Sequence, residues 1–520
     1  MVARAWRAVS EVAPKSPVGS DVVKQTHLVI SSFRMRISTA RPSVPLRVGV
    51  ALALALAACR GAANDLEPSP VKAVVPAPRT AALLDTLAER TFRWFWETTD
   101  ARTGLTPDRW PSRTFSSVAS IGFALTAYPI GAERGWITSN QAAERTLSTL
   151  RYLWQLPQGP EPRGVGGHQG FFYHFLEYET GHRYRDVELS TIDTALLLGG
   201  VLFCQSYFTG SDAIQVAIRA YADSLYRRVN WPWAVVRPHT VSMGWRPERG
   251  YITNDWTGYN EAMLLVILAL GSPTHPLEPA AWDAWTRTYR WNSFEGQPHL
   301  DFTPLFGHQY SHAWIDFRGI QDAYMRGQGI DYFENSRRAT LSQRAYAIRN
   351  PMQWRGYGPT VWGLTASDGP FNRTLVIDGV ERRFYSYWAR GASTKRINDD
   401  GTIAPTAAVS SIVFTPELSM EATVAMREQF GGLAWGAYGF LDAFNPTLRE
   451  PVEGLQHGRI VPGQGWVDGD YLGIDQGPIL LMLENWRSEL VWKTMRKNPY
   501  IVRGLRRAGF TGGWLGASTN

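Results

Sequence analysis

The stretch STIDTALLLGGVLFCQSYF, residues 190–208, decides the fold. Its middle, LLLGGVLFC, is an apolar run, so the stretch predicts a helix that packs against other helices and avoids water. The stretch NEAMLLVILALGS, residues 260–272, has the same character. Two such helices need further helices to cover them, and the sequence supplies these on both sides.

Segments with apolar residues at helical spacing run through the rest of the chain. In residues 81–99, Leu84, Leu87, Phe92 and Phe95 fall on one face of a helix. Similar segments follow at residues 116–131, 139–156, 213–230, 334–350, 406–430 and 477–497. Connections rich in Gly, Pro and Trp separate them, and they predict an all-α fold of helical hairpins with long functional loops at one end. LVIDGVERRFYSYW, within residues 371–388, predicts a small β insertion.

The composition describes a folded body with little net charge. Hydrophobic residues make up 44% of the 520 and charged residues 19%, so the chain can bury a large core. The formal net charge is +7, but residues 1–58 hold eight basic and two acidic side chains, which leaves the remainder close to neutral. We therefore expect no nucleic-acid partner. The 22 Trp, 21 Tyr and 22 Phe favour a protein that stacks aromatic rings on sugar faces.

The N-terminal region predicts export. PLRVGVALALALAA, residues 45–58, is a short apolar run after basic residues, which is the order of a secretory signal. The following Cys59 completes a sequence that resembles a bacterial lipobox, so we expect Cys59 to be lipidated, with ordinary signal-peptidase cleavage as the alternative. Met35 makes a better start for this leader, and residues 1–34 are interpreted as a gene-start artefact. The expected location is periplasmic or on the outer membrane, with membrane contact through the lipid alone.

The domain boundaries follow from composition. Residues 59–80, rich in Pro and Ala, predict a flexible tether after the lipid anchor. Residues 81–510 are interpreted as one domain and residues 511–520 as a tail. Cys204 is the only other cysteine, so the mature chain can form no internal disulfide, and its apolar setting predicts a buried thiol.

Seven blocks of the chain resemble the glucoamylase-like (glycoamylase) family. The resemblance covers roughly residues 85–505. The blocks are ELSTIDTALLLGG at 188–200, NDWTGYNEAMLLVILALGSPTH at 254–275, LFGHQYSHAWIDFRG at 305–319, WGLTASDGP at 362–370, DDGTIAPTAA at 399–408, GLAWGAYGFLDAFNP at 432–446 and YLGIDQGPILLMLEN at 471–485. The resemblance implies an (α/α)6 barrel with its active site at the loop end. Members of this family include bacterial endo-β-1,2-glucanases, and the transglycosylating region of cyclic β-1,2-glucan synthases is similar.

Glycoside hydrolysis needs two carboxyl groups, one protonated and one ionised. Glu261 precedes the apolar run AMLLVILAL, and burial there favours a general acid, although a helix N-terminus would favour the ionised form. The family resemblance supports the acid role. Asp442, in GAYGFLDAFNP, is the expected general base, or else a turn-capping residue. Asp368, in WGLTASDGP, is the rival catalytic residue, or else part of a turn.

Other polar and aromatic residues of the matching blocks are candidates for sugar binding. Asp193 and Asp475 either bind hydroxyls or cap helices, and Asp399 and Asp400 either bind hydroxyls or form a turn. We expect hydrogen bonds to sugar from His308, Gln309, Asp316 and Arg318. The candidates for ring stacking, which could equally be core residues, are Trp314, Trp362, Trp435 and Trp466. We expect no cofactor and no metal, because His308 and His312 lack an HExxH context and further ligands.

The leading hypothesis is therefore an exported glycoside hydrolase for β-1,2-glucan or its oligosaccharides. It is expected to invert the anomeric centre, as helical-barrel glycosidases of this kind commonly do. One alternative is a hydrolase of another glucan, α-linked ones included. The other is a lipid-anchored glycan-binding protein that has lost catalysis, and the acidic residues at both candidate catalytic positions count against it.

Overall fold

The computed structural model describes residues 74–516. The leader, Cys59 and most of the predicted tether lie outside the described residues. Within residues 74–516, none of the helices combines the length and the apolar character required to cross a bilayer.

An inner ring of helices forms the core of the molecule. These helices are buried on nearly every side, because their sequences offer no polar stripe to water. α3 packs against α5 and α14, and α5 packs against α7. The inner helices are α3 (Val118–Glu133), α5 (Thr191–Tyr207), α7 (Ala262–Gly271), α9 (Tyr310–Trp314), α12 (Pro405–Val409) and α14 (Gly473–Ser488).

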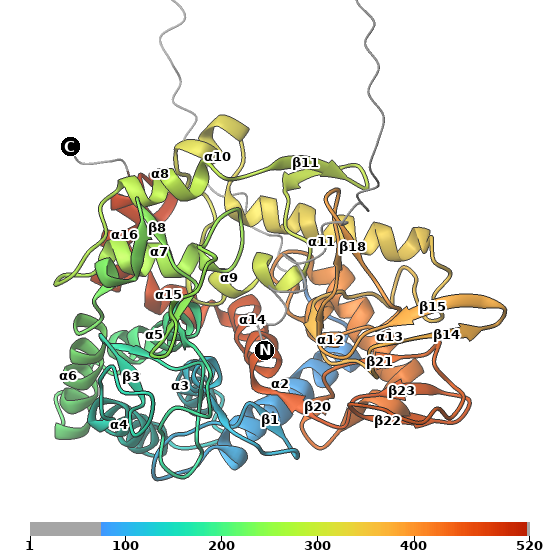
Figure 1. The fold of residues 1–520 in the computed structure, drawn as a ribbon, viewed down its shortest axis with the longest axis horizontal. Helices are drawn as coiled ribbons and strands as arrows, with labels where there is room; N and C mark the ends of the chain where they lie inside the picture. The colour runs from blue at the N-terminus through green and yellow to red at the C-terminus, as the bar shows by residue number, and fades with distance from the viewer. Residues whose placement is uncertain (1–73, 517–520) are drawn as a thin grey trace, which may run out of the picture.

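Longer amphipathic helices surround this ring, as Figure 1 shows. In α2 the face formed by Leu84, Leu87 and Phe92 is buried, as the sequence predicts. The outer helices are α2 (Pro78–Thr98), α4 (Ser139–Gln155), α6 (Ala213–Arg227), α11 (Tyr332–Arg349), α13 (Pro416–Ala434) and α16 (Pro499–Arg507). The short helices α8 (Ala280–Thr286), α10 (Ala323–Gln328) and α15 (Leu490–Met495) complete the helical body. The arrangement is an (α/α)6 barrel, which confirms the predicted fold class.

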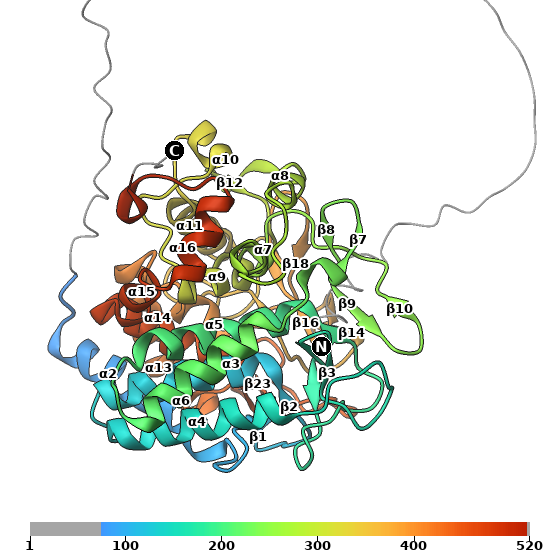
Figure 2. The same cartoon turned by 90° about the vertical axis from the view of Figure 1, so that its left-hand side faces the viewer.

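Short strands occupy the loops that connect the helices. Figure 2 shows β7, β8, β9 and β10 at one side of the helical body. The strands are β1 (Arg109–Trp110), β2 (Ser116–Ser117), β3 (Gly167–His168), β4 (Phe171–Phe172), β5 (Phe175–Leu176), β6 (Leu189–Ser190), β7 (Val235–Arg237), β8 (Thr240–Val241), β9 (Gly244–Arg246), β10 (Gly250–Tyr251), β11 (Trp291–Phe294), β12 (Gln297–Leu300), β13 (Ala366–Ser367), β14 (Arg373–Ile377), β15 (Val380–Phe384), β16 (Trp388–Ala389), β17 (Gly391–Ala392), β18 (Ile397–Asn398), β19 (Trp435–Gly436), β20 (Gly439–Phe440), β21 (Phe444–Asn445), β22 (Arg459–Val461), β23 (Gly465–Val467) and β24 (Tyr471–Leu472).

The predicted β insertion is present as the hairpin of β14 and β15. Arg373 pairs with Phe384 at its open end, and Ile377 pairs with Val380 beside the turn. Asp378 and Gly379 both have positive φ, which is what a tight two-residue hairpin turn requires. The other short pairs were not predicted, because two-residue strands are too short for an alternating pattern to show.

Three local expectations need adjustment. Residues 406–430 do not form one helix: α12 ends at Val409, and α13 begins at Pro416, where a proline lacks the N–H that a continuous helix would need. The folded body begins at Pro78 rather than residue 81. The described part of the predicted tail is also folded, since Thr511 pairs with Gln321 and the Trp514 indole donates to the Asp316 carbonyl. Cys204 is buried, as expected.

Candidate active site

Glu261 lies at the N-terminal end of α7, where the chain turns from a polar loop into the inner ring. Its side chain is 1% exposed, and the Ser311 hydroxyl fixes the local backbone by donating to the Glu261 carbonyl over 3.1 Å. Glu261 lines a narrow pocket with Asp193, Tyr310 and Tyr387. We call this the acid pocket. A proton donor in the acid pocket would face a ligand that is bound inside the barrel.

Asp193 enters the acid pocket from the first turn of α5. Ser190 caps that helix by accepting from the Asp193 amide at 3.2 Å, and its hydroxyl donates to Asp193 Oδ2 at 2.5 Å. His174 Nε2 lies 3.6 Å from the same oxygen. Asp193 Oδ1, in contrast, has no hydrogen-bond partner among the described residues and can accept a hydrogen bond. Asp193 can therefore take part in the helix cap and also contact a ligand in the acid pocket.

Asp442 and Asp475 form a buried pair of carboxyl groups. Asp442 follows β20, Asp475 lies in the first turn of α14, and both side chains are almost fully buried. Burial raises the pKa of Asp475 to about 7, and burial followed by the negative charges of Asp475 and Asp368 raises the pKa of Asp442 well above its usual range. Each of the two groups shifts the pKa of the other, so they release their protons in coupled steps. Such a pair can hold or release a proton near neutral pH.

Asp368 lies beside this pair and is tied to it through the backbone. Its amide donates to Asp442 Oδ2 at 2.8 Å. Arg109 Nη1 donates to Asp368 Oδ2 at 2.6 Å, and His457 Nδ1 lies 3.4 Å from that oxygen. The Arg109 guanidinium, which also contacts Asp108, holds the Asp368 carboxyl group in place, so the structure favours a positioning role for Asp368.

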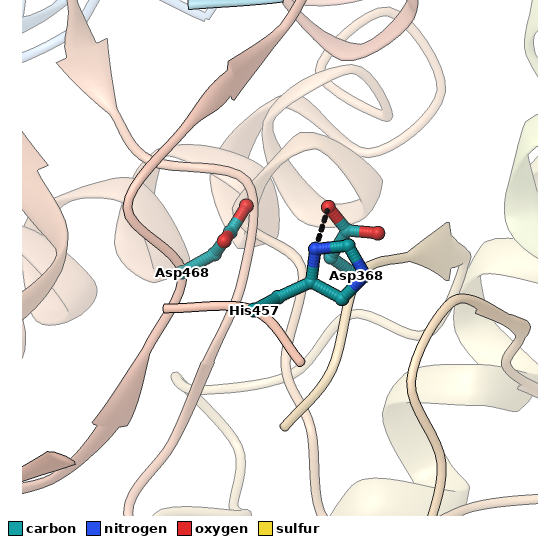
Figure 3. A group of neighbouring side chains, drawn as sticks. All are labelled: Asp368, His457 and Asp468. Atoms are coloured by element: carbon teal, nitrogen blue, oxygen red, sulfur yellow. Dashed lines mark ion pairs between the residues drawn. The ribbon is translucent and has the colours of Figure 1, made fainter. Parts of the chain in front are cut away.

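Asp468 brings a further carboxyl group to this cluster, and Figure 3 shows it facing Asp368 and His457. Ligand atoms of these three residues lie within 4.8 Å of one another, so they are the described side chains that could hold a metal ion. Their positions along the chain gave no sign of this. Arg109 already supplies a cation at Asp368, and burial followed by the charge of Asp368 raises the pKa of Asp468, so a proton can serve in place of a metal.

Two tyrosines connect the aspartates with the acid pocket. Tyr310 and Tyr387 both line the acid pocket beside Glu261. Burial followed by the charge of Asp475 raises the pKa of each tyrosine well above 10, and the charge of Asp442 adds to this in both. Both tyrosines are therefore close to Glu261 and to the Asp442–Asp475 pair, and they are neutral hydrogen-bonding groups.

Two wider hollows flank this centre. A cavity of about 330 Å³ shares Phe306 with the acid pocket and includes Tyr259, two residues before Glu261. We call it the basic cavity. A groove of about 580 Å³ is lined by Arg109, His457 and Asp470 and borders the aspartates. We call it the His457 groove. Both reach the surface, since exposed Arg290 lines the first and exposed Ser112 lines the second.

Several residues proposed as sugar ligands are occupied elsewhere. Asp316 binds the guanidinium groups of Arg318 and Arg496. Asp400 holds Arg390 through both oxygens, and Asp399 accepts from the hydroxyls of Tyr346 and Tyr357. Gln309 donates to Ala407 and Ser411, and His308 is buried against the Phe302 carbonyl. In this conformation none of these side chains lines the acid pocket.

The four tryptophans proposed for stacking lie outside the acid pocket as well. Trp314, Trp362 and Trp466 have no exposed surface, so a sugar face cannot reach them without rearrangement. Trp435 is partly exposed, but Arg90 and Arg427 cover its ring. The alternative interpretation, core packing, fits the three buried rings.

A helical barrel with buried, mutually perturbing carboxyl groups at its loop end defines the class: an (α/α)6 barrel equipped for acid–base chemistry. The Glycoamylase family model ("Putative glucoamylase") matches residues 253–499. A crystal structure of a "putative glucoamylase" from Bacteroides caccae is 31% identical over 83% of this chain and 99% of that chain, with a TM-score of 0.69. The chain belongs to the glycoamylase family.

Two other relatives carry more specific names. An endo-β-1,2-glucanase from Chitinophaga pinensis, solved with sophorotriose and glucose, is 28% identical over 84% of this chain and 100% of that chain, with a TM-score of 0.71. An exo-β-1,2-glucooligosaccharide sophorohydrolase from Parabacteroides distasonis is 28% identical over 459 residues, or 82% of this chain. The chain spans 57% of the length of that relative.

Proposed function

We propose that the protein hydrolyses β-1,2-linked glucan, with Glu261 as general acid and Asp442 as general base. The carrying observation is that Tyr310 is near both acidic groups, with Glu261 beside it in the acid pocket and the charge of Asp442 raising the pKa of its hydroxyl. In this proposal the scissile glycosidic bond lies between the two groups. Glu261 at the start of α7 donates a proton, and Asp442 in the loop after β20 accepts one. The names of the two β-1,2-glucan relatives support the linkage.

The first test is a panel of glucans. Linear β-1,2-glucan, soluble starch and β-1,3-glucan are incubated with the protein, and new reducing ends are measured. We expect release from β-1,2-glucan alone. Release from starch would support the alternative of an α-glucan hydrolase, and binding without release from any glucan would support the non-catalytic alternative.

We propose inversion of the anomeric centre. An inverting enzyme places a water between base and sugar, which needs carboxyl groups roughly 6.5–9.5 Å apart or a bridging group, whereas about 5–5.5 Å suits a nucleophile. Burial and the neighbouring carboxyl groups raise the pKa of Asp442, so its ionised form is a stronger base toward a water molecule. Proton NMR of the first product should show the anomer opposite to the substrate linkage, and the same anomer would overturn this step.

The flanking hollows favour cleavage within a chain. The basic cavity adjoins the acid pocket through Phe306, and Arg109 of the His457 groove binds Asp368, so both hollows offer room for a glucan beyond the scissile bond. The Parabacteroides relative, an exo-acting sophorohydrolase by name, favours release of disaccharide from an end instead. Early products decide: a ladder of oligosaccharides supports endo action, and sophorose alone supports exo action.

We also propose that the protein is an exported lipoprotein anchored through Cys59. The support is the leader sequence, in which a short apolar run ends directly before this cysteine. The Cys59→Ala variant should lose its membrane association, measured by fractionation of cells. A variant that still sediments with membranes would contradict the proposal.

A further inference from the structure

Two of the cations that line the basic cavity have no acidic ion-pair partner among residues 74–516. Arg290 and Lys395 line it and are exposed, and neither forms an ion pair within residues 74–516. Arg396 lines it as well, whereas Asp301 is the one acidic residue in its wall. Elsewhere in the described chain many arginines are paired with Asp or Glu, so this concentration of cations is local.

The loops that carry these cations are held by the fold. Lys395 and Arg396 lie in the turn between β17 and β18, where Gly391 pairs with Asn398 and the Ser393 amide donates to the Arg396 carbonyl at 2.9 Å. Arg290 directly precedes β11, and its carbonyl accepts from the Asp301 amide at 2.8 Å. The positive groups therefore come from two separate, backbone-fixed hairpins that face one cavity.

The remaining wall suits a sugar. Tyr259, Phe302 and Phe306 supply aromatic surface, and Thr257, Thr303 and Asn398 supply hydroxyl and amide groups. Apolar ring surface with a few placed polar groups is the composition of a small-ligand site, and a pyranose has one apolar face and an equatorial rim of hydroxyls. Because Phe306 also borders the acid pocket, a sugar in the basic cavity belongs to the same chain as the sugar at Glu261.

We propose that the basic cavity binds a glucosyl unit that carries an anionic ester, so that the preferred substrate is an acidic, substituted glucan. The inference rests on the proposed glucan hydrolysis and adds the chemical class of the substituent. A dicarboxylic half-ester and a phosphate ester both fit this description, because each places a negative charge on a short ester substituent.

The test compares neutral linear β-1,2-glucan with the same glucan after partial succinylation and after partial phosphorylation. For at least one acidic form, the kcat/KM of the wild-type protein should be about fivefold above its kcat/KM for the neutral form. The difference should come mainly from a lower KM. This advantage of the acidic form should decrease in high salt, because salt screens the charges. In the Arg290→Gln/Lys395→Gln variant the ratio of kcat/KM for the acidic glucan to kcat/KM for the neutral glucan should fall to about one. Arg151→Gln, an exposed arginine on α4, is the matched control.

Each outcome has a defined meaning. A preference for the succinylated or the phosphorylated form, lost in the double variant, supports the proposal and identifies the source of the charge. Equal use of all three forms, or a preference that survives the double variant, overturns it. Calorimetry measures the binding of the acidic glucans to the Glu261→Gln protein, with and without the double substitution. This experiment tests the cavity without turnover, so a lack of turnover in the wild-type protein would contradict only the proposed hydrolysis.

Discussion

Asp442 and Asp316 are both buried aspartates that sequence motifs marked as site residues, yet their surroundings are opposite. Asp316 lies between the guanidinium groups of Arg318 and Arg496, so its charge is neutralised where it stands. Asp442 lies beside Asp475 and Asp368, so its charge is opposed by its neighbours. Burial alone therefore does not identify a catalytic acid. A carboxyl group that is buried among other carboxyl groups has a strongly perturbed pKa, and such groups cluster at functional sites.

Asp400 shows that distance from the site is not the deciding feature. It belongs to the same loop region as Asp368, since Arg390 donates both to Asp400 and to the Ser367 carbonyl. Its charge is nevertheless paired through two oxygens with a guanidinium that is fully buried. Asp400 holds the loop in shape, and the neighbouring Asp368 is positioned by it at the centre.

The largest effect should come from removing the two proposed catalytic groups. Glu261→Gln and Asp442→Asn should each lower kcat by roughly 10²–10⁴-fold, because each removes a proton transfer in the transition state. The melting temperature of Asp442→Asn should not fall, since the amide relieves repulsion with Asp475. Initial rates on β-1,2-glucan and thermal melts provide the measurement, and a variant that keeps near-normal turnover would remove that residue from the mechanism.

The second-largest effect is expected at Asp316, the aspartate that lies between two arginines. Asp316→Asn should destabilise the protein by about 1–3 kcal/mol, because it leaves two guanidinium groups with a weaker acceptor in a partly buried position. Turnover per folded molecule should stay unchanged. Urea unfolding and rates at a temperature where both proteins are folded check this, and a selective loss of kcat would return Asp316 to the active site.

The third effect concerns pH. Asp475→Asn removes a negative charge that raises the pKa of Asp442, so the acid limb of the kcat/KM profile should move to lower pH, by roughly one unit. Asp475 in the folded protein has its pKa raised from 3.8 to about 7, so its contribution to stability is present at acid pH and is lost as the pH rises through about 7. Melts at pH 4 and pH 8 should therefore favour the variant increasingly as pH rises; an unchanged difference would mean that Asp475 does not titrate in this range.

The smallest effect is expected at Trp435. Its ring is covered by Arg90 and Arg427 and lines none of the three hollows at the site. Trp435→Ala should change KM for glucan by less than about twofold, within the range of surface substitutions. A large increase in KM would restore Trp435 as a stacking platform.

Much of the helical body could be predicted, because continuous apolar runs and helical spacing are properties of neighbouring residues. The N-terminal placement of Glu261 on its helix followed from one segment, NEAMLLVILAL, and the structure agrees. No local pattern pointed to Arg109, His457 or Tyr387 as residues of the centre. A useful signal was present in WVDGDYLGIDQ, residues 466–476, where three aspartates fall within one short stretch of the chain.

The sequence by itself determined the class of fold, the family and the set of acids from which a catalytic pair is drawn, because these depend on local pattern and on motifs in order. Only the tertiary structure decided which acids face each other and which face arginine. Asp442, in the loop after β20, meets Asp475 from α14 and Asp368 from another loop, while Asp316 meets Arg496, which is 180 residues away in the chain. The charge state of a buried acid depends on such long-range neighbours, and no local pattern encodes them.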